Sequence, residues 1–68
     1  MISYENYRAA VKRAQAKHPS WRYGQALFNV LKEYEPDLAR EVLAEDVDPF
    51  YVDARAGLFL DWLRARLP

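Results

Sequence analysis

The chain has 68 residues, of which 51% are hydrophobic and 29% charged, and its ten basic residues balance its ten acidic ones. This length supports one core, so we expect a single domain over 1–68, and the apolar content excludes a disordered chain. Because cysteine is absent, histidine occurs once and no apolar run could span a membrane, we expect a cytoplasmic protein with no disulfide, metal, cofactor or membrane contact.

Two helices are predicted in the first half of the chain. Ser3 is a favourable cap for a helix that begins near Tyr4, and Pro19 ends this helix by disfavouring helical geometry at the residue before it. Ser20 is expected to cap a second helix over 21–34, which carries the strongest apolar periodicity in the chain. Gly24 costs about 1 kcal/mol in a helix interior. It therefore indicates close approach of another helix, which we favour, or tolerance in the first turn.

The second half of the chain predicts a short helix followed by a connection. The short helix begins at a proline, which suits a first turn, and covers 36–45. The connection 46–53 contains an aspartate-proline turn. We expect this turn to place the aromatic pair Phe50 and Tyr51 in the core.

A last helix is predicted over 54–66, with Asp53 placed to cap it. Its broad apolar face carries Leu58, Phe59, Trp62 and Leu63. The fold class that follows is all-α, a small helical bundle of three longer helices and one short helix. The expected core consists of Val11, Leu27, Phe28, Leu31, Leu38, Val42, Phe50, Phe59, Trp62 and Leu63.

Charge is distributed unevenly along the chain. The first 25 residues hold five basic residues against one acid, whereas 33–53 holds eight acids against one arginine. The basic set could bind nucleic acid weakly, and it consists of Arg8, Lys12, Arg13, Lys17 and Arg22. The acidic stretch lacks the spacing of a calcium loop, so we interpret its carboxylates as a solvated face; they include Glu41, Glu45, Asp46, Asp48 and Asp53.

The residues suited to catalysis are better explained by capping. His18 lies at the predicted end of the first helix, and the two serines, Ser3 and Ser20, lie at predicted helix starts. We therefore expect no enzymatic activity. The surface nominated for partner binding is instead a polar and aromatic stripe on the second helix, formed by Trp21, Arg22, Tyr23, Gln25, Asn29 and Lys32.

Two motifs carry a family resemblance. One is Pro-x-Trp-Arg-x-Gly-Gln-Ala-Leu-Phe-Asn over 19–29, and the other is Asp-Pro-Phe-Tyr over 48–51, followed by an aromatic-rich last helix. Together they resemble a group of short bacteriophage and prophage proteins with no assigned activity, so the resemblance implies provenance and no catalytic residues. Arg22, Gln25 and Asn29 are expected to hydrogen-bond the 48–51 segment.

The predicted function is that of a small non-enzymatic protein-binding domain, a phage-type accessory or inhibitor that acts by occluding its partner. The partner is an unidentified protein or a second copy of the chain. Two alternatives stay open, namely a weak nucleic-acid-binding module that uses the basic first helix and a purely structural homo-oligomer.

Overall fold

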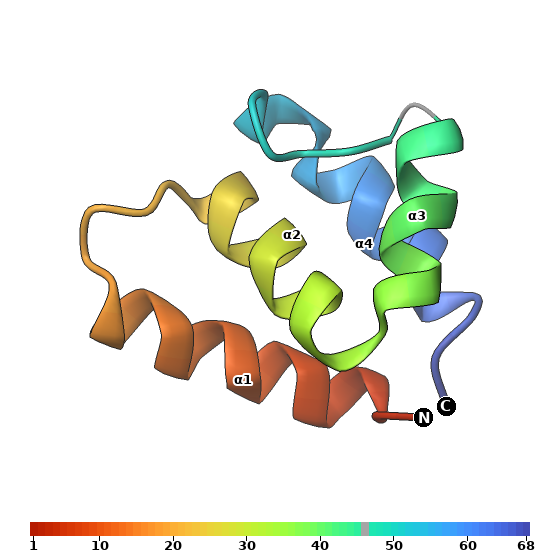
Figure 1. Ribbon diagram of the computed structural model, residues 1–68, viewed down its shortest axis with the longest axis horizontal. Helices are drawn as coiled ribbons and strands as arrows, with labels where there is room; N and C mark the ends of the chain where they lie inside the picture. Colours follow the sequence, from red (N-terminus) through yellow and green to blue (C-terminus); the bar gives the residue numbers. More distant parts are fainter. Residues whose placement is uncertain (46) are drawn as a thin grey trace.

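The computed structural model of the protein describes residues 1–45 and 47–68, so the predictions that involve Asp46 lie outside the described residues. All regular structure in the described residues is helical, which confirms the all-α prediction (Figure 1). The elements are α1 (Tyr4–Lys17), α2 (Tyr23–Tyr34), α3 (Pro36–Ala44), the 3₁₀ turn η1 (Asp53–Arg55) and α4 (Ala56–Arg64).

The helix lengths differ from those predicted. α1 has 14 residues and α2 has 12, while α3 and α4 have nine each, so two helices are long and two are short. The last helix is shorter than expected because its first turn is the separate 3₁₀ turn η1 and because it ends at Arg64. The Asp53 side chain does not cap this turn, whose N-cap residue is Val52.

The break between α1 and α2 confirms one capping prediction and corrects another. The Ser3 hydroxyl accepts the Asn6 N–H at 3.0 Å and caps α1 as predicted. Ser20 does not cap α2, because the Trp21 N–H donates to the His18 carbonyl at 3.0 Å and forms a turn that delays the helix. α2 therefore begins at Tyr23, and its N-cap residue, Arg22, makes no capping hydrogen bond with its side chain.

α2 is the central helix, as its apolar periodicity predicts. It contacts α1, α3, η1 and α4, and Figure 1 shows it enclosed by the other helices. Seven of the predicted core residues are buried, namely Val11, Leu27, Leu31, Leu38, Val42, Phe59 and Leu63. The core also contains six residues that the prediction omitted, which are Tyr7, Ala10, Ala26, Val30, Ala39 and Leu67.

Three predicted core residues, Phe28, Phe50 and Trp62, are only half-buried. The Phe50 ring packs edge-on against Phe28 at a centroid distance of 5.9 Å and therefore covers the core from outside. Trp62 is covered by the Arg66 guanidinium, which lies 3.9 Å from the indole centroid. Its Nε1 atom is buried and has no hydrogen-bond partner among the described residues.

Two side chains lie on the surface: Tyr51, which was expected in the core, and Leu58, which was assigned to the apolar face of the last helix. Tyr51 is 79% exposed because Phe50, which it contacts at a ring distance of 4.6 Å, takes the inner position. Leu58 is 64% exposed. The helical rotation of about 100° per residue places it off the face that carries Phe59 and Leu63.

The segment 48–53 closes over the start of α2. The Asp48 carboxylate accepts the Phe50 N–H at 2.9 Å, which confirms the predicted turn, and buried Pro49 follows it. A Cβ atom on Gly24 would overlap the Pro49 carbonyl oxygen and lie 2.8 Å from Asp53 Oδ1. The predicted close approach at Gly24 is therefore confirmed, although a connecting segment rather than a helix makes it.

Candidate functional site

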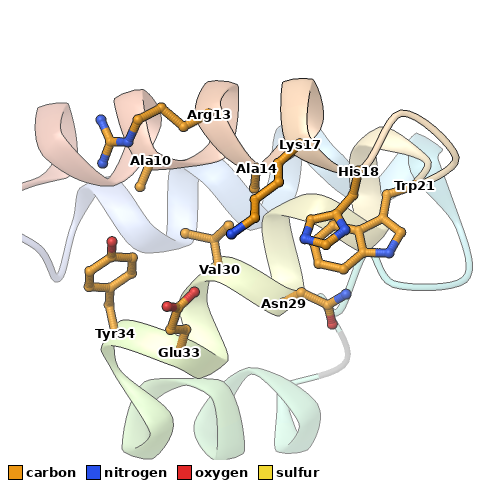
Figure 2. Close-up of a pocket in the computed structure, with 10 residues that line it drawn as sticks. All are labelled: Ala10, Arg13, Ala14, Lys17, His18, Trp21, Asn29, Val30, Glu33 and Tyr34. Carbon is orange, nitrogen blue, oxygen red and sulfur yellow. The ribbon is translucent and has the colours of Figure 1, made fainter.

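A groove runs between the second half of α1 and the outer side of α2. Figure 2 shows this α1–α2 groove, whose volume is about 320 Å³. Its lining comprises Ala10, Arg13, Ala14, Lys17, His18, Trp21, Asn29, Val30, Glu33 and Tyr34. It combines an apolar floor, an aromatic end and charged rims, so it can hold a ligand that is partly apolar and partly charged.

Small side chains form the floor of the groove. Ala10 and Ala14 are four residues apart on α1 and so lie on the same side of that helix, and Val30 faces them from α2. Larger side chains at these positions would fill the space between the two helices. The groove therefore exists because alanine occupies both α1 positions.

An aromatic pair closes one end of the groove. The rings of His18 and Trp21 stack with their centroids 3.9 Å apart and their planes within 13° of each other. His18 is the C-cap residue of α1, and its backbone N–H donates to the Ala14 carbonyl, so its position is fixed by the helix end. The prediction that His18 ends the first helix is confirmed, and its ring supports Trp21.

The two rims carry unequal charge. Arg13 and Lys17 are exposed side chains on the α1 rim, and Glu33 is the acid on the α2 rim. Figure 2 shows Lys17 extending from α1 toward α2 and Glu33 rising from α2 toward it, while Tyr34 lies opposite Ala10. The groove opening is therefore net positive, and the positive charge lies on the α1 side.

A second hollow lies on the other side of α1, and its lining includes Arg8, Lys12 and Tyr23. Arg8 donates hydrogen bonds of 3.2 Å to the Tyr4 and Tyr23 hydroxyls. The bond to Tyr4 raises the pKa of Arg8 above its usual value. This guanidinium links α1 to the start of α2 and is engaged within the domain.

The five cations proposed for nucleic-acid binding do not form one surface. Arg8 and Lys12 line the second hollow, Arg13 and Lys17 line the α1–α2 groove, and Arg22 lies at the 48–53 segment. A continuous track of phosphates would have to pass around α1 to reach all five. The division follows from the helical period, because positions 8 and 12 point about 100–180° away from positions 13 and 17.

The residues of the predicted partner-binding stripe are also divided. Trp21 and Asn29 line the α1–α2 groove, Tyr23 lines the second hollow, and half-buried Gln25 and exposed Lys32 lie outside both. Sequence reasoning missed that the basic residues Arg13 and Lys17 share a groove with Trp21. The signal was present as two pairs at four-residue spacing, Ala10 with Ala14 and Arg13 with Lys17.

Arg22 contacts the segment that closes over the start of α2. Its guanidinium donates to the Phe50 carbonyl at 2.5 Å and to the Tyr51 carbonyl at 3.2 Å, and it lies 3.8 Å from Asp53 Oδ1. The expected link between Arg22 and the 48–51 segment is therefore confirmed. Among the described hydrogen bonds to that segment, none comes from Gln25 or Asn29.

Asp53 acts at the start of α2 rather than at its own helix. Its Oδ1 atom accepts the Gly24 N–H at 3.1 Å, at a helix end whose own N-cap side chain makes no such bond. A carboxylate also suits the positive end of the helix dipole. The 48–53 segment thus caps α2 from 29 residues away.

Within residues 1–45 and 47–68, no three histidine, aspartate or glutamate side chains lie close enough to hold a metal ion. No helix in this part of the chain has the length and apolar character needed to span a membrane. Comparison of the chain with the sequence profiles of known families, with curated proteins and with solved structures gives no match. The resemblance to phage-type proteins stays a prediction.

Proposed function

We propose that the protein is a small non-enzymatic protein-binding domain, and that its α1–α2 groove receives a segment of the partner. The partner is then blocked by occlusion, as expected of a phage-type accessory or inhibitor. The single observation that carries this proposal is the His18–Trp21 stack at the end of a net positive groove.

The composition of the groove favours a protein partner. Tryptophan and arginine are over-represented among the side chains that dominate the energy of protein interfaces, and Trp21 and Arg13 both line this groove. A volume of about 320 Å³ is at the small end of the range for small-molecule pockets. It suits one or two side chains of a partner segment better than a cofactor.

The groove is also largely formed before binding. The His18–Trp21 stack and the turn between these residues fix the aromatic end, since the Trp21 N–H already donates to the His18 carbonyl. A side chain that is ordered in the free protein loses little conformational entropy when it is covered. Binding through this stack therefore needs no rearrangement of α1 or α2.

The test is retention of a partner by immobilised protein from a bacterial lysate. Trp21→Ala removes the aromatic end of the groove, and Leu58→Ala is the matched control because Leu58 is exposed and lies outside the groove. We expect wild type and Leu58→Ala to retain the same specific protein and Trp21→Ala to lose it. Absence of a specific protein from a chain that is also monomeric, or retention unchanged by Trp21→Ala, would refute the proposal.

A light-scattering measurement over a concentration series decides whether the partner is a second copy. Self-association that Trp21→Ala abolishes would identify the chain itself as the occupant of the groove. A monomer at all concentrations leaves the groove free for a different protein.

A further inference from the structure

The charges of the groove indicate the chemistry of its occupant. Arg13 and Lys17 lie on one rim of the groove, and neither takes part in the two described ion pairs, which are Arg22 with Asp53 and Arg40 with Asp37. Both side chains are exposed, so their positive charges face any segment that enters the groove. A ligand that brings negative charge to the α1 rim would complement them.

We propose that the groove binds an acidic segment of another protein, with an aromatic side chain of that segment against Trp21 and a neighbouring carboxylate between Lys17 and Arg13. This inference rests on the proposed protein-binding function and adds the chemical class of the partner. The aromatic contact follows from the His18–Trp21 stack. The carboxylate follows from Lys17, which lies near the stack, and from Arg13, which lies farther along the same rim (Figure 2).

Glu33 determines the orientation of the segment. It lies on the α2 rim and faces Lys17 across the groove, so it repels carboxylates that approach α2. The acidic side chains of the segment are therefore directed toward α1. The same repulsion gives a distinctive prediction, because removal of the Glu33 charge should strengthen binding while removal of the Lys17 charge should weaken it.

The experiment is a nuclear magnetic resonance titration of ¹⁵N-labelled protein with four synthetic nonapeptides of one design. The first peptide has a phenylalanine flanked by two glutamates, the second has glutamines in place of the glutamates, the third has lysines there, and the fourth has alanine in place of phenylalanine. We expect the first peptide to shift the Lys17 and His18 amide signals and the Trp21 indole signal. We expect it to bind about fivefold more tightly than the glutamine peptide at low salt.

Three charge variants separate local from general electrostatics. Lys17→Gln is expected to weaken binding of the first peptide about threefold, and Glu33→Gln to strengthen it about twofold. Lys12→Gln is the matched control, because it removes the same charge from the opposite side of α1 and should change binding little.

Four outcomes would overturn the inference. Equal binding of the glutamate and glutamine peptides, or an equal effect of Lys12→Gln and Lys17→Gln, would show that acidity does not select the ligand. Absence of any shift in the groove up to millimolar peptide would refute the ligand class, although retention of a lysate protein that depends on Trp21 would leave the proposed function standing. A dimer that the first peptide dissociates would show that the occupant is a second copy.

Discussion

Gly24 is the second residue of α2, and the 48–53 segment lies directly against it. A methyl group at this position would overlap the Pro49 carbonyl oxygen and come within 3.0 Å of the Pro49 carbonyl carbon. Both atoms belong to the backbone of a buried residue, so they cannot turn aside as a flexible side chain would. Gly24→Ala must therefore displace the segment.

The expected cost of Gly24→Ala is about 1.5–5 kcal/mol in the free energy of unfolding. Alanine gains up to about 1 kcal/mol in helix propensity. Against this gain stand the overpacking at Pro49, about 1–3 kcal/mol, and the loss of the hydrogen bond from Gly24 to the Asp53 carboxylate, about 1.5–3 kcal/mol. The losses exceed the gain, so Gly24→Ala lowers the free energy of unfolding. At an ordinary glycine inside a helix, the same substitution raises it.

Gly57 provides the control in the same chain. It lies in the first turn of α4, and a Cβ atom there would meet no heavy atom within 4 Å beyond its chain neighbours and the backbone of its own helix. Gly57→Ala is expected to stabilise the protein by about 0.5–1 kcal/mol. Urea unfolding followed by circular dichroism measures both variants, and a Gly24→Ala protein as stable as wild type would refute the account of this contact.

Three further predictions concern the core and the clamp at Arg22, by which we mean the hydrogen bonds from its guanidinium to the Phe50 and Tyr51 carbonyls. Burial raises the pKa of Tyr7 far above its usual value of about 10, so the folded state keeps a proton that the unfolded chain releases above that pH. At pH 7, Tyr7→Phe should lower the free energy of unfolding by about 1 kcal/mol, because it removes the hydrogen bond to the Leu27 carbonyl. Near pH 11.5 the variant should be more stable than wild type, because phenylalanine has no proton for the unfolded chain to release. Urea unfolding at both pH values measures the two effects. Arg22→Ala should cost about 1–2 kcal/mol in the same assay, and Arg22→Lys should recover only part because lysine cannot donate to two carbonyls in the same fork. Leu63→Ala should cost about 2–5 kcal/mol in melting experiments, whereas Leu58→Ala should change stability by less than about 0.5 kcal/mol.

Local rules predicted the helices well and failed at two caps, one because of a local turn and one because of a distant contact. The α1 cap at Ser3 and the apolar period that makes α2 the central helix depend on neighbours in sequence, and both are as predicted. Ser20 has the right chemistry for a cap, but the turn at 18–21 moves the helix start beyond it. Asp53 lies next to a helix that it does not cap, because its carboxylate bonds to Gly24 across 29 residues.

The groove required information that no single helix contains. Its floor combines Ala10 and Ala14 of α1 with Val30 of α2, and the pairing of these two helices is a tertiary contact. The division of the basic set could have been predicted, because the helical period alone places Arg8 and Arg13 on different sides of α1. The link between Arg22 and the 48–51 segment was predicted and is observed, although the sequence also nominated Arg22 for binding a partner.

The clamp at Arg22 affects how groove variants must be interpreted. Arg22 is adjacent to Trp21 and holds the 48–53 segment, which in turn caps α2 at Gly24. Loss of the clamp would loosen the start of α2 and, with it, the aromatic end of the groove. Arg22→Ala would then weaken partner binding without removing any contact to the partner. Arg22 is therefore a positioning residue. The loss of partner binding in Arg22→Ala should disappear when this variant and Arg22→Lys are compared at equal folded fraction. The loss of partner binding in Trp21→Ala should persist at equal folded fraction.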